Sequence, residues 1–281
     1  MIQKLTGRFS AVLSGLALLT GCSRGEVERT EWPVMGTVAA VQTRGATPEA
    51  TAKAVRAVKA EFARVEKLLN AHDPNSELSR LAPLPEKEIL ERCDESVRPC
   101  YEMAFELTKA SGGAFNPRWR GTNTLDLGAI AKGFAVDCAV FSGAFACVGP
   151  DALVDLGGNL FSAKGSWRTG IAGTDEVMAL NEGFACATSA EYYRGKHIRD
   201  GRTGQSVSNG VVSVTVQVAG SAMEADGLST TLFVLGPEEG KKFLDEKWKT
   251  AGVQAVWFMQ DGAVISAHAL TCSSLLRGFG K

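Results

Sequence analysis

The chain has few of the groups that nucleic-acid-binding proteins and zinc proteins need. Its 281 residues include 30 Lys or Arg against 31 Asp or Glu, which gives a formal net charge of −1, and no long basic run is present. Nucleic acid is therefore not an expected partner, because phosphate backbones are bound by clustered positive charge. There are three histidines, and none of the seven cysteines shows the CxxC spacing of a zinc site. A cysteine metal centre is not expected either.

The sequence also lacks a hydrophobic segment long enough to span a bilayer. The apolar run Phe9–Leu19 is too short for that, and it follows a positive segment containing Lys4 and Arg8. This order is typical of a secretory signal. The next residues, Leu19-Thr20-Gly21-Cys22, resemble the lipobox of bacterial lipoproteins, in which cleavage precedes an acylated cysteine. The alternative is an ordinary secretory signal with a chance cysteine.

These features predict a lipoprotein signal peptide over 1–21, a lipidated Cys22 with a polar tether over 22–31, and one domain over 32–281. Several acyl chains on one residue would anchor the protein stably in a membrane. The expected location is the bacterial cell envelope, facing the periplasm, on the outer membrane or on the periplasmic face of the inner membrane. Disulfides are permitted there, and Cys93 with Cys100 is a candidate pair.

Apolar periodicity predicts the secondary structure. Helices are expected over 48–70, 96–110 (with Ser96 as N-cap), 129–141, 221–235 and 238–248. Strands are expected over 152–156, 183–188 and 211–218, with a hairpin formed by 253–259 and 263–267. Helices and strands are mixed without regular βαβ alternation, and no linker divides the mature chain. The predicted fold class is therefore α+β, a single domain of mixed or antiparallel sheets packed with helices.

The segment from Asp126 to Asp137 has the composition of a phosphate site. It combines a carboxylate, two glycines and Lys132 where a short apolar segment leads into the third predicted helix. Amides at a helix start attract phosphate, and glycine lets the backbone approach it closely. Lys132 would add a positive charge for the same anion.

Asp226 and Thr230 are four residues apart on a predicted helix and therefore project from one face. A carboxylate with a hydroxyl suits a hard cation such as Mg²⁺, which also binds substrate phosphate. The alternative is a solvated aspartate and a threonine facing the core. Glu224, on another face of the helix, is a weaker ligand candidate.

Two turn-rich segments are further candidates. His197 lies beside Asp200 in a polar stretch ending at Gly204 and is a candidate base, and Arg202 is a candidate phosphate ligand. The alternative is a hairpin turn set by Asp-Gly and Thr-Gly. The stretch Asp155-Leu-Gly-Gly-Asn159 admits a close ligand or forms a plain strand-end turn.

These segments occur in a set order with four others, which are Met35-Gly36-Thr37, Asn75 to Arg80, Gly113 to Asn116 and Ala187-Thr188-Ser189. In this order the chain resembles the FAD:protein FMN transferases, the ApbE-type flavin transferases, many of which are exported lipoproteins. The resemblance implies a T-fold-like architecture. It also implies Mg²⁺-dependent transfer of the FMN moiety of FAD to a Thr or Ser hydroxyl of an acceptor protein, with release of AMP.

The resemblance also implies residue roles. Contacts to FAD are expected from Met35, Ala114, Phe115, Asn116, Asp126, Lys132, His197 and Ile198. A magnesium site is expected from the backbone oxygen of Ala129 and the side chains of Asp226 and Thr230, with Ser229 lending its backbone. The catalytic groups would be His197 as base, Lys132 as phosphate clamp and Asp226 as metal ligand.

The expected acceptors are flavoprotein subunits of exported or membrane redox complexes. Two other readings remain: an FAD pyrophosphatase that releases FMN and AMP, and a non-catalytic FAD-binding lipoprotein. Three departures from the family bear on the choice. First, only nine residues, 117–125, separate the Gly113–Asn116 motif from the motif that begins at Asp126, where family members usually have a long segment. Second, His72 stands where members often have an aromatic residue. Third, Gly201 stands where members usually have a proline.

Overall fold

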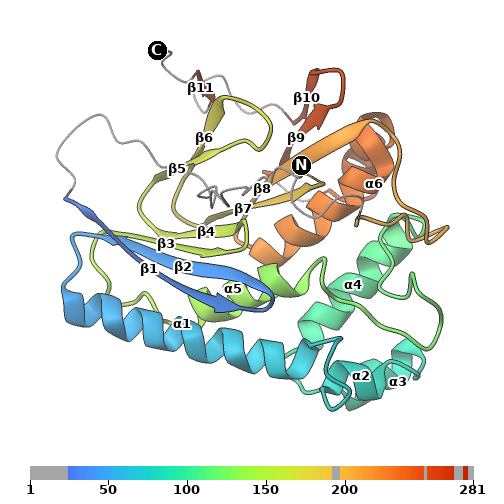
Figure 1. Ribbon diagram of the computed structural model, residues 1–281, viewed down its shortest axis with the longest axis horizontal. Helices are drawn as coiled ribbons and strands as arrows, with labels where there is room; N and C mark the ends of the chain where they lie inside the picture. The colour runs from blue at the N-terminus through green and yellow to red at the C-terminus, as the bar shows by residue number, and fades with distance from the viewer. Residues whose placement is uncertain (1–24, 192–196, 250–251, 269–274, 278–281) are drawn as a thin grey trace, which may run out of the picture.

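The computed structural model describes residues 25–191, 197–249, 252–268 and 275–277 (Figure 1). The predicted signal peptide and Cys22 lie outside these ranges. The larger sheet consists of β1 (Val27–Val34), β2 (Thr37–Arg44), β3 (Asp151–Leu156), β4 (Asn159–Lys164), β7 (Phe184–Ala190), β8 (Val211–Ala219), β9 (Gln254–Met259) and β10 (Val264–Ala267). These eight strands pair in the order β1-β2-β3-β4-β7-β8-β9-β10, and each neighbouring pair is antiparallel. A three-stranded sheet contains β5 (Trp167–Gly170), β6 (Glu176–Leu180) and β11 (Leu275–Arg277).

The described helices are α1 (Pro48–Leu69), α2 (Glu77–Leu81), α3 (Glu86–Arg92), α4 (Arg98–Ala110), α5 (Ala131–Phe141) and α6 (Ala222–Glu246). Figure 1 shows α1 and α5 on one side of the large sheet and the small sheet on the other. The fold is thus a single α+β domain, as predicted. None of the helices in the described ranges combines the length and apolar character needed to cross a membrane.

Helix α1 forms where the apolar spacing predicts it. Its buried side chains recur three or four residues apart and face the core: Val55, Val58, Phe62, Val65 and Leu69. Thr47 caps the helix by accepting a hydrogen bond from the Ala50 amide, and Pro48 occupies the first turn, where its missing N–H is not needed.

Three local predictions were wrong. Helix α4 begins at Arg98, with Val97 and not Ser96 at the N-cap, because the Ser96 hydroxyl donates to Asp94 and accepts from Arg64. The predicted tether over 22–31 overlaps β1, which starts at Val27 and pairs with β2. Cys93 and Cys100, the candidate disulfide pair, are both buried free thiols.

Helix α6 joins two predicted helices. It is a single element with a kink at Gly236, whose backbone has φ 72° and ψ 176°, and Pro237 follows. The Asn209 amide caps the first half by donating to the backbone oxygens of Phe233 and Val234 at 2.9 and 3.2 Å. The break therefore falls where the Gly-Pro pair predicts it.

The N-terminus of α6 is capped by a side chain from α5. The carboxylate of Asp137 accepts hydrogen bonds from the Ala222 amide at 2.7 Å, the Met223 amide at 3.0 Å and the Ser221 hydroxyl at 2.9 Å. These amides have no partner within their own helix. Burial raises the pKa of Asp137 to about 6, against the effect of these hydrogen bonds.

Helix α6 returns a similar contact to α5. The Gly133 amide, in the first turn of α5, donates to Oδ2 of Asp226 at 2.9 Å. A Cβ atom at Gly133 would lie 2.6 Å from the carbonyl carbon of Ala222 and 2.8 Å from Cβ of Asp226. The two helices can cross this closely only because residue 133 has no side chain.

Candidate active site

The start of α5 brings together three of the predicted site residues. Lys132 Nζ donates to the backbone oxygen of Gly128 at 2.7 Å and lies 3.7 Å from Asp226 Oδ2. Asp126 Oδ1 accepts from the Gly128 amide at 2.9 Å, and its other oxygen lies 3.5 Å from the guanidinium of Arg120. Lys132 and the Gly133 amide thus place two positively polarised groups beside one carboxylate, at the positive end of a helix dipole.

Asp226 is the buried acid of this cluster, with 6% of its surface exposed. Burial raises its pKa, and the charge of Lys132 opposes that shift. Its Oδ2 is bound by the Gly133 amide, whereas no described residue donates a hydrogen bond to its Oδ1. One carboxylate oxygen is therefore held by the protein and the other is available for a ligand.

Hydroxyl groups extend this cluster along α6. Ser229 Oγ donates to the backbone oxygen of Asp226 at 2.9 Å. Ser189, at the end of β7, has its Oγ 2.8 Å from Ser229 Oγ and 3.0 Å from Thr230 Oγ1. The predicted metal-site residues of α6 are thus neighbours in space, and Ser189 joins them from the sheet. Ala129 lies in the turn just before α5 and is partly buried.

The donor set at this junction consists of oxygen atoms. No group of three or more His, Cys, Asp or Glu side chains that could hold a metal occurs in the described part of the chain. A cation here would be bound by the single carboxylate of Asp226 with hydroxyl and backbone oxygens. Mg²⁺ fits such a set, since it needs few protein ligands when waters and substrate phosphate supply the others.

Two segments that the resemblance predicts to contact FAD, 113–116 and the one containing His197 to Gly204, lie against each other. The Gly201 amide donates to the backbone oxygen of Ala114 at 3.0 Å, and the Asn116 side chain donates to the backbone oxygen of Gly201 at 3.1 Å. A Cβ atom at Gly201 would lie 2.5 Å from the backbone oxygen of Gly113. The glycine that departs from the family pattern therefore permits this contact. Ala114 and Phe115 are buried.

The candidate residues of segment 197–204 have different surroundings. His197 is exposed and Ile198 is buried. Asp200 is paired with Arg202, whose guanidinium lies 2.7 Å away and holds the pKa of that carboxyl below its usual range. Arg202 also lies 3.7 Å from Glu239. Arg202 is therefore neutralised by two carboxylates, so its predicted role as a phosphate ligand is not favoured.

The short segment 117–125 is fixed by one side chain. The Arg118 guanidinium donates to the backbone oxygens of Ala82 at 2.7 Å and Leu84 at 2.6 Å, and to that of Thr122 within the segment. The Asp126 amide donates to the backbone oxygen of Pro117 at 2.8 Å, which closes the segment at its base. These bonds give a compact loop and hold Asp126 at its end.

Met35 occupies the turn between β1 and β2. Met35 and Gly36 have φ values of 51° and 67°, and Val34 pairs with Thr37 across them. Positive φ at both central residues is the type I′ geometry that suits a hairpin. A non-glycine residue in this region costs about 1 kcal/mol or more, and such strain is found at ligand sites. The Met35 amide also donates to Glu66 Oε1 at 2.9 Å.

Two weaker candidates have structural roles. Glu224 accepts a hydrogen bond from the Trp248 indole at 2.6 Å, in the core and not in the oxygen cluster. The Gly158 amide donates to Asp155 Oδ1 at 2.9 Å, which is the geometry of a strand-end turn. A Cβ atom at the preceding Gly157 would lie 2.5 Å from Thr37 Oγ1. The group that lies close to the backbone of Gly157 is therefore the Thr37 side chain and not a ligand.

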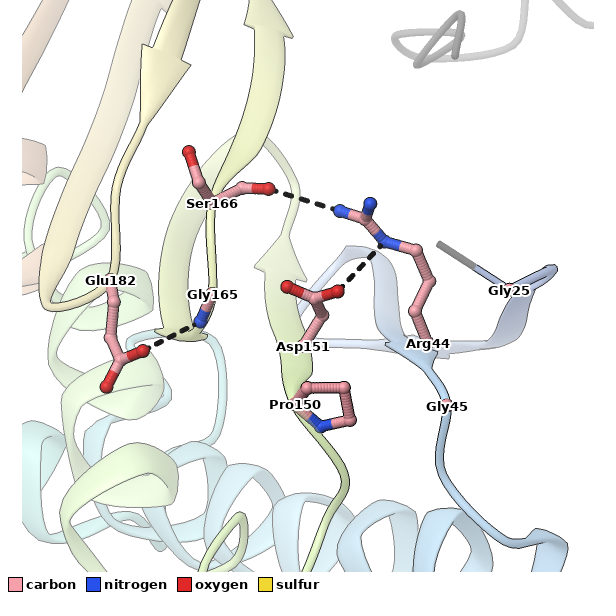
Figure 2. Close-up of a pocket in the computed structure, with 8 residues that line it drawn as sticks. All are labelled: Gly25, Arg44, Gly45, Pro150, Asp151, Gly165, Ser166 and Glu182. Carbon is pink, nitrogen blue, oxygen red and sulfur yellow. Dashed lines mark hydrogen bonds and ion pairs between the residues drawn. The ribbon is translucent and has the colours of Figure 1, made fainter. Parts of the chain in front are cut away.

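A cavity of about 510 Å³ lies elsewhere, near the ends of β2 and β3 (Figure 2). Arg44 lies 3.7 Å from Asp151, donates to the backbone oxygen of Ser166 at 3.1 Å and stacks on the Trp167 ring. None of the predicted site residues lines this cavity. The charged groups that line it bind other protein groups, so the α5–α6 junction is the better candidate site.

Solved structures define the class of fold. The flavin transferase ApbE from Vibrio cholerae superposes with a TM-score of 0.71 at 22% identity, covering 86% of this chain and 97% of that one. The apo form of the flavinyl transferase ApbE from Pseudomonas stutzeri gives 0.70 at 23% identity, covering 86% and 95%. This chain therefore has the fold of the ApbE-type structures.

Sequence comparison gives the family. The model of the ApbE family matches residues 35–122 and 118–257, and the chain belongs to this family. A curated FAD:protein FMN transferase of Treponema pallidum (strain Nichols) is 34% identical over 167 residues, covering 50% of this chain and 45% of the relative. One of Vibrio cholerae serotype O1 is 36% identical over 138 residues, covering 41% and 40%. The matched region spans less than half the length of these relatives.

Proposed function

We propose that this protein transfers the FMN moiety of FAD to a Thr or Ser hydroxyl of an acceptor protein and releases AMP. Membership of the ApbE family and the names of the curated relatives support this activity. The structural observation that carries it is the junction of α5 and α6. There Lys132, the Gly133 amide and Asp226 meet beside the hydroxyl of Thr230, at a helix start suited to phosphate.

The reaction is a displacement at phosphorus. The acceptor oxygen forms a bond to the FMN-side phosphorus of FAD, and the bond from that phosphorus to the bridging oxygen breaks, so AMP leaves with the bonding pair. The exposed His197 would take the proton of the acceptor hydroxyl. Lys132 would hold the phosphate oxygens that gain charge, with the amides at the start of α5. Positioning and charge neutralisation are the main needs of such a transfer.

Asp226, Thr230 and the backbone oxygen of Ala129 would hold Mg²⁺, with the backbone of Ser229 beside them. When bound there, Mg²⁺ would neutralise charge on the substrate phosphates. Two observations support this assignment: no described residue donates a hydrogen bond to Asp226 Oδ1, and the neighbouring groups that could bind a cation are hydroxyl and backbone oxygens.

The flavin half of FAD would contact Met35 at its strained turn, Ala114 to Asn116, Ile198, and Asp126 at the end of the short loop. Asp126 is held between the Gly128 amide and Arg120, so it accepts hydrogen bonds in a fixed direction. A rigid acceptor of this kind orients a bound ligand without a cost in side-chain entropy.

The lipobox-like sequence supports a lipid anchor at Cys22 and a location at the periplasmic face of the cell envelope. The acceptors would then be flavoprotein subunits of exported or membrane redox complexes.

The test combines the chain from Ser23 onward with FAD, Mg²⁺ and a candidate acceptor domain. Flavin fluorescence that stays with the acceptor on a denaturing gel, with an equal amount of AMP, is the expected result. AMP and free FMN without a labelled acceptor would indicate hydrolysis. FAD binding without any AMP would contradict the proposed activity.

A further inference from the structure

Three hydroxyl groups form a chain of hydrogen bonds from a backbone carbonyl to Thr230. Ser229 Oγ lies 2.9 Å from the backbone oxygen of Asp226, Ser189 Oγ lies 2.8 Å from Ser229 Oγ, and Thr230 Oγ1 lies 3.0 Å from Ser189 Oγ. Ser229 is fully buried, while Ser189 and Thr230 are half-buried. Ser229 is therefore the buried end of this chain of hydroxyl groups, and Thr230 is its other end.

Proton counting fixes the direction of all three bonds. A carbonyl oxygen only accepts, so the single proton of Ser229 is donated to the oxygen of Asp226. Ser229 must then accept from Ser189, which uses the one proton of Ser189. Ser189 must in turn accept from Thr230. The three bonds form together in this arrangement alone, since each hydroxyl carries one proton.

The consequence is that Thr230 presents only lone pairs to its remaining surroundings. Its proton is turned toward the sheet, and no described residue other than Ser189 is hydrogen-bonded to its hydroxyl. The next residue, Thr231, shows the usual alternative, since it donates to the backbone oxygen of Gly227 one turn earlier at 2.8 Å. A hydroxyl oxygen whose proton points away in this way can bind a hard cation through its lone pairs. The same lone pairs could accept a hydrogen bond from a water or a ligand donor, which is a less specific role.

The geometry points to Ser189 as the positioning residue of the cation site: it accepts a hydrogen bond from the Thr230 hydroxyl and so turns the lone pairs of Thr230 toward the ion. This inference rests on the proposed function, because it takes Thr230 and Asp226 as magnesium ligands. Ser189 does not bind the ion itself. Its role is that of an outer-shell partner, and loss of such partners typically weakens metal affinity 10- to 100-fold.

The chain offers a matched control on the same strand. Thr188 also makes a hydroxyl–hydroxyl bond, to Thr215 on β8 at 2.9 Å. Side chains alternate along a strand, so Thr188 points to the face of the sheet opposite to Ser189 and α6. Thr188→Val therefore removes a hydrogen bond of the same type without touching the cation site.

The experiment uses the full chain, loaded with FAD and titrated with Mg²⁺. The first readout is the Mg²⁺ concentration that gives half of the rise in thermal unfolding temperature. The second is the separation of KM for Mg²⁺ from kcat in AMP release, and the third is the Kd of FAD without metal. Ser189→Ala is expected to raise the half-saturating Mg²⁺ concentration about tenfold. FAD affinity without metal should be unchanged, and most of kcat should return at saturating Mg²⁺.

Ser189→Thr, which keeps a hydroxyl, should restore most of the Mg²⁺ affinity, and Thr188→Val should match the wild type. If Ser189→Ala is poorly folded, Ser189→Cys replaces it, because a thiol of similar size is a weak hydrogen-bonding group. Wild-type Mg²⁺ affinity in Ser189→Ala, or in Ser189→Cys where that variant replaces it, would overturn the role of Ser189 and leave the proposed function intact. An equal loss in Thr188→Val would also overturn it. A wild-type protein indifferent to Mg²⁺ would instead remove the metal part of the proposed function.

Discussion

The crossing of α5 and α6 at Gly133 gives the sharpest test of the site. In Gly133→Ala the new methyl group would lie 2.6 Å from the carbonyl carbon of Ala222 and 2.8 Å from Cβ of Asp226. Carbon atoms in contact are normally about 3.5–4.0 Å apart, so the two helices must separate by about 1 Å. Both partners are parts of buried helices, so neither can move aside as the end of a flexible side chain can.

The expected loss of stability follows from three contributions. Overpacking of a buried contact costs roughly 1–3 kcal/mol. Weakening of the hydrogen bond from the Gly133 amide to the Asp226 carboxylate costs roughly 1.5–3 kcal/mol when it is lost entirely. Alanine in a helix offsets this by about 1 kcal/mol relative to glycine. The free energy of unfolding should therefore fall by about 2–4 kcal/mol.

The same displacement moves Asp226 relative to Lys132. A shift of about 1 Å in a positioned group can slow a reaction about 100-fold, so AMP release should fall by that order at saturating FAD. Urea unfolding and an AMP assay measure the two effects. Gly170→Ala is the control, because nothing lies within 4 Å of a Cβ atom there and its φ is not positive. A Gly133→Ala protein as stable and as active as the wild type would refute the close crossing of α5 and α6.

Three further outcomes follow from buried groups. Because burial raises the folded pKa of Asp137 to about 6 from an ordinary 3.8, the folded state binds the extra proton between these values. The free energy of unfolding should therefore fall by about 2 kcal/mol as pH rises from about 4 to about 7, and urea titrations of Asp137→Asn should lack this part of the slope. Trp248→Phe leaves the buried Glu224 carboxylate without its indole donor, so the free energy of unfolding should drop by about 1–3 kcal/mol, and a smaller loss would place Glu224 in contact with solvent. Asp226→Ala should stay folded by circular dichroism but lose Mg²⁺-dependent AMP release, and full activity in this variant would contradict the metal assignment.

The helices were the easiest elements to predict, because their signals are local. The apolar spacing within 48–69 and the Gly236-Pro237 break are each contained in a few consecutive residues. The strands β3, β7 and β8 and the hairpin of β9 with β10 also matched their predictions, for alternation and turn residues are local too. Strand β1 was not predicted, because it is a partly exposed edge strand whose polar residues resemble those of a tether.

The small sheet and the short helices were not predicted. Strands β5 and β6 have four and five residues, too few for a clear period. Helix α2 has five residues and depends on the Ser76 cap, which accepts from the Ser79 amide. Elements of this size are stabilised by what they pack against, which a local pattern does not contain.

For the candidate site, the sequence by itself determined which residues lie on the same helix and on which part of it. Asp226 and Thr230 lie one turn apart on one helix, and Lys132 lies in the first turn of another, because helical spacing fixes both facts. The family motifs also contained Ser189, but nothing in its neighbourhood indicated a role.

The tertiary structure alone decided which of these helices and strands are in contact. Gly133 reaches Asp226 across 93 positions of sequence, Asp137 reaches Ala222 across 85, and Ser189 reaches Thr230 across 41. Such contacts depend on how α5, α6 and β7 pack, and packing is set by the shapes of buried surfaces that are distant in the chain. Local periodicity predicts which face of a helix is buried. It does not predict which other element packs against that face, because that depends on the packing of the whole core.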